Sequence, residues 1–131
     1  MITAVRSTAI VARELLAWSI GRRSWVRVDG ESMQPALEAG DVVLVGALRP
    51  SPGHIVVFED PEQPARRLIK RYASRGDRGF AVMSDNPAVA RDSRHLGSIS
   101  FDRLIGRATL VFDRKGRIRR LRDPRPPEQE T

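Results

Sequence analysis

The chain has no cysteine, few histidines and few aromatic residues. Its 131 residues include no cysteine, which excludes a disulfide scaffold, a thiolate zinc site and a cysteine nucleophile. The two histidines, His54 and His95, are too few for a multi-histidine metal site. No run of about 18 apolar residues occurs, so no standard membrane-spanning helix is expected. The chemistry that remains belongs to hydroxyl, carboxylate and amine groups.

Lysine is also scarce, although the chain is strongly basic. Only Lys70 and Lys115 are lysines among 23 basic residues, and the net charge is +7. Such a charge favours acidic partners, but an arginine-rich, lysine-poor composition is also typical of a coding bias. Aromatic residues make up 5% of the chain, without the interleaving that nucleic-acid surfaces usually show. We therefore expect a single soluble domain with short appendages and no nucleic-acid partner.

Residues 1–23 are predicted to form an N-terminal amphipathic helix. Apolar residues recur at helical spacing from Val5 to Ile20, with polar residues on the opposite face. One interpretation is an interfacial helix with Trp18 in the lipid headgroup layer and arginines on anionic lipid. The other is a helix that packs against its own domain. The sequence leaves both open.

Residues 24–122 are predicted to form a mostly β domain. Short runs rich in β-branched residues alternate with turns rich in glycine and proline. The expected strands cover residues 25–28, 42–45, 55–58, 68–72, 80–83, 104–112 and 118–121. Residues 123–131 are expected to form a flexible tail. The predicted fold class is therefore mostly β with an N-terminal helix.

Ser32 stands at a corner that can present a nucleophile. The preceding strand ends at Gly30, and Pro35 prevents another strand from starting at once. Such a corner exposes a side chain and leaves backbone N–H groups free, as an acyl-transfer nucleophile requires. Most serines at corners are turn or cap residues, so the local pattern leaves both roles open.

A serine nucleophile needs a base, and Lys70 is a better candidate than either histidine. His54 follows a Pro-Gly turn and His95 lies in a polar loop, which favours surface roles for both. A lysine can act as a base only when neutral, so its reference pKa of about 10.4 must fall through burial in apolar surroundings. Strand alternation puts Lys70 on the same face as Leu68 and Tyr72. A lysine on a strand face that carries both polar and apolar residues is ordinarily solvated. The strand pattern alone therefore does not decide whether Lys70 is a general base.

Five short motifs follow one another between Trp25 and Phe112. They are Ser32-Met33, Ile69-Lys70-Arg71, Asp85-Asn86, Asp92-Ser93-Arg94 with Gly97, and Leu104-Ile105-Gly106-Arg107. This ordered set resembles the type I signal peptidase family of serine proteases, which use a Ser/Lys dyad. The two motifs that contain Ser32 and Lys70 are shared with self-cleaving repressor-type peptidases. The later aspartate motifs favour the signal peptidases.

The resemblance implies a signal-peptidase-like catalytic β-fold with Ser32 as nucleophile and Lys70 as general base. Gly30 and Met33 would lie in the cleft, where the backbone N–H of Ser32 donates to the oxyanion. Structural support would come from Asp85, Asn86, Asp92 and Arg94, the last two as an ion pair behind the lysine strand. The resemblance implies no metal and no other cofactor.

The chain departs from the pattern of this family at four points. Gly30 stands where some members carry a hydroxyl residue that aids the oxyanion. Ala90 stands where a serine or threonine often contacts the lysine, so Lys70 is expected to be less well oriented. Ser84 replaces the usual glycine before Asp85-Asn86. The fourth departure is the lack of a clear membrane anchor.

The compact spacing, the missing anchor and the arginine-rich composition favour a particular kind of relative. They suggest the nickel-type superoxide dismutase maturation proteases, which remove a short N-terminal leader. The expected partner is therefore a precursor protein with such a leader, with the nickel superoxide dismutase pro-form as the specific candidate. General processing of exported preproteins is an alternative.

A second alternative belongs to another functional class. The basic stretch from Arg114 to Arg125 could make the chain a non-catalytic binding module on a degenerate protease fold. A solvated terminal strand and tail would explain the same residues. The expected location is the cytoplasm or the periphery of the cytoplasmic membrane, with membrane contact through residues 1–23.

Overall fold

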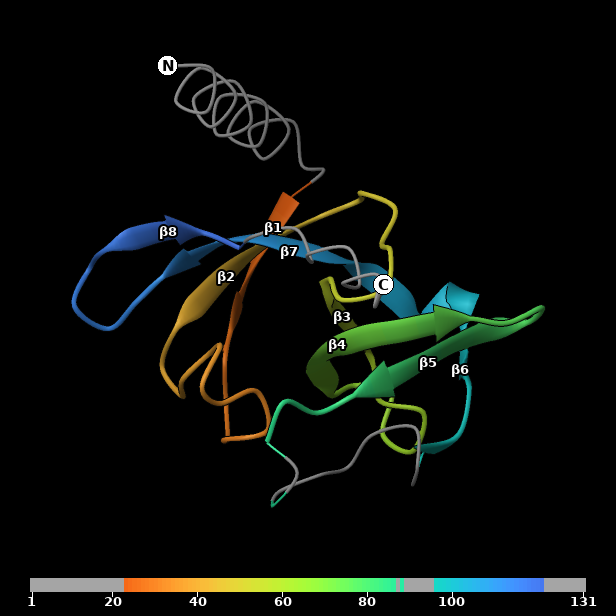
Figure 1. The fold of residues 1–131 in the computed structure, drawn as a ribbon. Helices are drawn as coiled ribbons and strands as arrows, with labels where there is room; N and C mark the ends of the chain where they lie inside the picture. Colours follow the sequence, from red (N-terminus) through yellow and green to blue (C-terminus); the bar gives the residue numbers. More distant parts are fainter. Residues whose placement is uncertain (1–22, 87, 89–95, 122–131) are drawn as a thin grey trace, which may run out of the picture.

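The computed structural model of this chain describes residues 23–86, 88 and 96–121, and it contains one curled antiparallel sheet (Figure 1). The eight strands are β1 (Arg23–Arg27), β2 (Val42–Gly46), β3 (Ile55–Glu59), β4 (Arg67–Arg75), β5 (Gly79–Met83), β6 (Ile99–Ser100), β7 (Leu104–Phe112) and β8 (Ile118–Arg120). A short 3-10 helix, η2 (Phe101–Arg103), precedes β7. The mostly β prediction is confirmed.

The long strand β7 joins the two halves of the sheet. The strand order is β1-β2-β7-β3-β4-β5-β6, with β8 paired to β7 as well. β2 pairs with β7 from Arg107 to Phe112, whereas β3 pairs with its first residues, from Leu104 to Arg107. The β1–β2 pair and the β4–β5 hairpin consequently lie on opposite sides of the molecule (Figure 1).

β3 is buried on both faces, as its uninterrupted apolar sequence predicts. Because side chains alternate along a strand, β3 and β4 contribute to two separate hydrophobic clusters. The first cluster includes Ile55, Val57 and Ile69, and the second includes Val56, Phe58, Leu68 and Tyr72. The two clusters fix β4 from both sides, and Lys70 lies between Leu68 and Tyr72 on the face of the second cluster.

All seven predicted strands are present, with bounds that differ by a few residues. The additional strand β6 has only two residues, too few to show a period in the sequence. The helix expected over residues 1–23 lies outside the described residues except for Arg23, which already belongs to β1. The tail expected over residues 123–131 also lies outside them. Within the described ranges, no helix is long and apolar enough to cross a bilayer.

Candidate active site

The corner that carries Ser32 is a tight turn anchored in the core. Gly30 has a φ of +81°, a conformation that glycine adopts without strain, and it turns the chain out of the strand direction. The backbone N–H of Leu37 then donates to the carbonyl of Met33 at 2.9 Å. Met33 and Leu37 are 2% and 0% exposed, so both side chains fix the turn in the first hydrophobic cluster. Ser32 itself is half-buried, next to exposed Glu31.

Lys70 is a buried residue in the middle of β4. It is 4% exposed, and it pairs in register with fully buried Val56 on β3. Burial among apolar side chains penalises the charged ammonium form of a lysine and favours the neutral amine. The solvated position that is ordinary for a strand lysine is thereby excluded. Burial on this face is what the candidate general base requires.

A three-residue segment after β5 connects the serine corner to the lysine strand. The backbone N–H of Asn86 donates to the carbonyl of Ser32 at 2.9 Å, and its side-chain amide donates to the carbonyl of Glu31 at 3.2 Å. Two residues earlier, the hydroxyl of Ser84 accepts a hydrogen bond from Lys70 Nζ at 3.1 Å. Ser32 and Lys70, which are far apart in sequence, are therefore both bound to residues 84–86.

Asp85, the middle residue of this segment, forms an ion pair with Arg71. Arg71 Nε donates to Asp85 Oδ1 at 3.1 Å, and Nη2 contacts the other carboxylate oxygen. The third guanidinium nitrogen, Nη1, donates to the carbonyl of Gly53 at 2.8 Å. Bidentate pairs of this kind fix geometry as well as contributing energy. Arg71 thus clamps the segment against the strand at the residue that follows Lys70.

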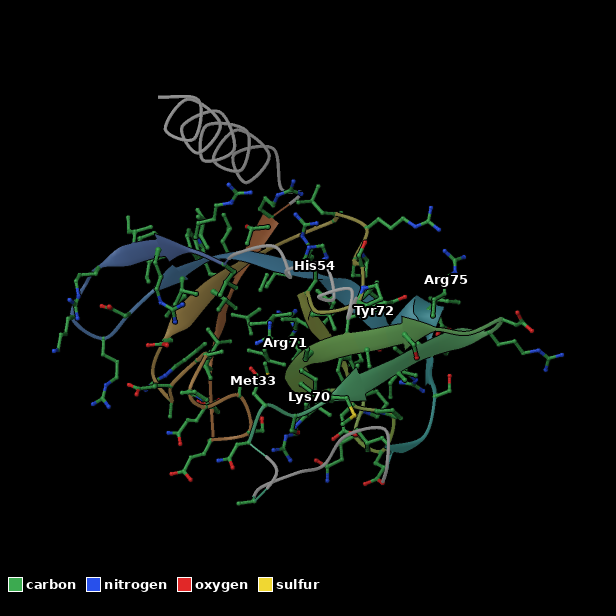
Figure 2. All side chains as sticks on the ribbon, viewed as in Figure 1. Met33, His54, Lys70, Arg71, Tyr72 and Arg75 are labelled. Carbon is green, nitrogen blue, oxygen red and sulfur yellow. The ribbon has the colours of Figure 1, made fainter. Side chains whose placement is uncertain are left out.

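Figure 2 shows the side chains of Met33, Lys70 and Arg71 around the start of β4, with Arg75 at its far end. Near that far end lies a hollow of about 560 Å³, whose lining includes Tyr72, Arg75, Phe101 and Leu104. Neither Ser32 nor Lys70 lines it.

Some of the remaining predicted site residues lie at the site, and others lie outside the described residues. Gly30, Met33, Asp85 and Asn86 all lie at the serine corner or on the connecting segment. Ala90, Asp92 and Arg94 lie outside the described residues, so the ion pair expected between the last two stays a prediction. His54 Nδ1 accepts a hydrogen bond from the backbone N–H of Ser51 at 2.8 Å, which is a turn contact.

Sequence reasoning missed two contacts at the site. It named Asp85 as structural support without a partner, and Arg71 only as part of a motif. It treated Ser84 only as a replacement for glycine, although Ser84 contacts Lys70 directly. No local signal in the sequence gives the Lys70–Ser84 contact, because it depends on the register of β4 with β5, in which the last pair is Arg71 with Met83 and the next step sets Lys70 opposite Ser84.

The described part of the chain contains no group of three or more His, Asp or Glu side chains that could hold a metal ion. The groups that the described site does bring together are a hydroxyl, a buried amine and backbone N–H groups. These are the components of acyl transfer by a serine whose base is a lysine.

A comparison with protein-family models identifies a peptidase family. The model described as Peptidase S24-like matches residues 9–107, a span that includes the serine corner, β4 and the connecting segment. No curated protein matches the chain at a significant level. The match covers well over half of the sequence and supports serine-peptidase chemistry, without selecting a subfamily. The chain therefore belongs to the Peptidase S24-like family.

Proposed function

We propose that this protein is a serine endopeptidase in which Ser32 is the nucleophile and Lys70 the general base. The observation that carries the proposal is the burial of Lys70 at 4% exposure, together with its hydrogen bond to the segment that also binds Ser32. Burying the charged form of a lysine among apolar side chains is costly, so burial favours the neutral amine. A neutral amine beside a serine is the arrangement that activates a hydroxyl.

The edge of β4 next to Lys70 supports a mode of substrate binding. β5 pairs with β4 only from Arg71 onward, whereas β3 pairs with it from Arg67 to Arg71. On the β5 side, residues 67–69 therefore have no strand partner among the described residues. An extended precursor segment can add there as a further strand, with its main chain bound to the edge. This docking would bring a scissile peptide bond next to Lys70.

The proposed reaction proceeds by acyl transfer. Neutral Lys70 Nζ takes the proton from Ser32 Oγ, and Oγ forms a bond to the scissile carbonyl carbon. The backbone N–H of Ser32 donates to the oxyanion, with Gly30 supplying no side chain, and one such donor typically contributes about 3 kcal/mol. The C–N bond then breaks, and the leaving amine receives the proton from Lys70. Water activated by the same amine hydrolyses the acyl-enzyme and frees Ser32.

We propose that the substrate is a precursor protein with an N-terminal leader, and that the nickel superoxide dismutase pro-form is the specific candidate. The ordered motifs and the compact spacing of Ser32 and Lys70 support this choice. General processing of exported preproteins is the second candidate. A leader that binds in an extended conformation would suit the free edge of β4.

The test is cleavage of these precursors by the purified full chain, with new N-termini identified by mass spectrometry. We expect one specific new N-terminus from at least one precursor. Ser32→Ala should abolish it while leaving the fold intact by circular dichroism. Ser74→Ala is the matched control, because Ser74 is an exposed serine on β4, and it should cleave as the wild type does. Equal cleavage by the Ser32 variant would contradict the proposal.

The basic hairpin of β7 and β8 supports the rival function, a non-catalytic module on an anionic surface. Five cationic residues follow one another closely there: Arg114, Lys115, Arg117, Arg119 and Arg120, all exposed. Ile118 between them is 60% exposed. Electrostatic binding should weaken steeply with salt and should not respond to Ser32→Ala. Sedimentation with anionic vesicles at two salt concentrations separates this function from proteolysis.

A further inference from the structure

We infer that Ser84 is the positioning residue that orients the amine of Lys70 for proton transfer. The inference rests on the proposed function, because it assigns Ser84 a role toward the proposed general base. Its foundation is the part-buried hydrogen bond of 3.1 Å between Lys70 Nζ and Ser84 Oγ. Lys70 is 4% exposed and Ser84 is half-buried.

The strand register explains why these two side chains meet. β4 and β5 are antiparallel, and their pairing ends at Arg71 with Met83. Continuing the register by one residue sets Lys70 directly opposite Ser84. Side chains of directly opposite residues lie on the same face, with their Cβ atoms about 5 Å apart. The contact is therefore built into the β4–β5 hairpin and does not depend on a chance rotamer of a flexible side chain.

The chemistry of an amine gives this contact a function. A neutral lysine amine has two N–H groups and one lone pair, and only the lone pair can accept the proton of a nucleophile. Rotation about the Cε–Nζ bond would otherwise point the lone pair in several directions. When Ser84 accepts one N–H, that rotation is restricted. Residues 84–86 also bind the corner of Ser32, so one segment holds both the base and the nucleophile.

Arg71 and Val56 are the neighbours of Lys70 along β4 and across to β3. Arg71 follows Lys70 on the opposite face of β4, and its charge is paired with Asp85. The residue opposite on β3 is Val56, which is apolar and fully buried. Ser84, by contrast, is a polar residue in hydrogen-bond contact with the Lys70 amine, so it can tune the state of that amine locally.

The first test is kinetic. With a cleaved precursor, Ser84→Ala should lower kcat by about tenfold, the size of one ordinary hydrogen bond, while KM stays within about twofold. Ser84→Thr keeps the hydroxyl and should restore most of kcat. The control Ser74→Ala should behave as the wild type does. A wild-type kcat for Ser84→Ala, or equal losses of activity and stability in the Ala and Thr variants, would overturn the inference.

The second test needs no substrate. The chain has only two lysines, so two sets of side-chain resonances appear in lysine-labelled protein, and Lys115→Ala assigns them. An ammonium group is a stronger hydrogen-bond donor than a neutral amine, so Ser84 stabilises the charged form. Ser84→Ala should therefore lower the pKa of Lys70 and leave that of Lys115 unchanged. An unchanged titration of Lys70 would overturn the inference even if the precursor is cleaved.

The two failures are distinguishable. If the wild type cleaves no precursor but the Lys70 titration responds to Ser84→Ala, the proposed function fails and the contact stands. If the wild type cleaves and neither kcat nor the titration responds, the role of Ser84 fails and the proposed function stands.

Discussion

The ion pair between Arg71 and Asp85 allows a quantitative prediction about the site. Asp85→Ala removes two hydrogen bonds from a guanidinium group, and Arg71→Ala removes the same two and the bond to the Gly53 carbonyl. The two side chains are 30% and 20% exposed, so solvent screens the pair only in part. The perturbation therefore tests how firmly residues 84–86 are held to β4.

The magnitude follows from this intermediate burial. Hydrogen bonds to charged groups contribute about 1.5–3 kcal/mol, whereas exposed ion pairs contribute about 0–1 kcal/mol. We expect a coupling free energy of about 2 kcal/mol between Arg71 and Asp85 in a double-mutant cycle. Arg71→Ala should cost about 1 kcal/mol more than Asp85→Ala, because it also breaks the bond to Gly53.

The assay is chemical denaturation of the wild type, the two single variants and the double variant, with unfolding monitored by tryptophan fluorescence. The chain supplies its own control, since Arg27 and Asp29 form an ion pair at 4.0 Å with side chains 74% and 91% exposed. That pair should show a coupling below about 0.5 kcal/mol. If the coupling of Arg71 with Asp85 does not exceed that of the control, the clamp does not exist as described.

Three further predictions concern the scaffold. Leu37→Ala should lower the free energy of unfolding by about 3 kcal/mol in denaturant titrations, because Leu37 is 0% exposed in the first hydrophobic cluster; a cost below about 1 kcal/mol would contradict its packing. Gly106→Ala should lower Tm strongly by circular dichroism, because a Cβ there meets the carbonyl of Gly46 on the paired strand; an unchanged Tm would contradict the β2–β7 register. The pKa of Asp113 should lie below its ordinary value of 3.8 in an NMR titration, chiefly because the backbone N–H of Arg117 donates to the carboxylate. Because the pKa of Asp113 is lower in the folded state than in the unfolded state, Asp113 stabilises the fold above the unfolded pKa. This stabilisation is lost as the pH falls through the folded pKa. A measured folded-state pKa of Asp113 above 3.8 would refute this prediction.

Local features of the sequence were sufficient to predict seven of the eight strands. β3 is a run of apolar and β-branched residues between a Pro-Gly turn and a proline-rich loop, and such signals act over a few residues. β6 was missed because two residues, Ile99 and Ser100, cannot show a period. The position of β7 between β2 and β3 was not predictable, because strand order depends on long-range packing.

The sequence analysis proposed the members of the candidate site but not their contacts. Ser32 and Lys70 were identified from a corner, an apolar run and the family resemblance. The partner of Lys70 depends on the register of β4 with β5. One residue more or one residue fewer in the turn between these strands would change that register. Arg71 had two carboxylates in nearby motifs to pair with, and composition alone could not choose Asp85 over Asp92.

The central claim is that a buried, neutral Lys70 activates Ser32, and the most direct test compares the two lysines of the chain. The measurement is the rate at which purified Lys70→Ala and Lys115→Ala proteins cleave the precursor that the wild type cleaves. Lys115 is exposed on the hairpin before β8, so its variant should match the wild type. Lys70→Ala should remain folded and show no cleavage. Cleavage by folded Lys70→Ala protein at the wild-type rate would contradict the account.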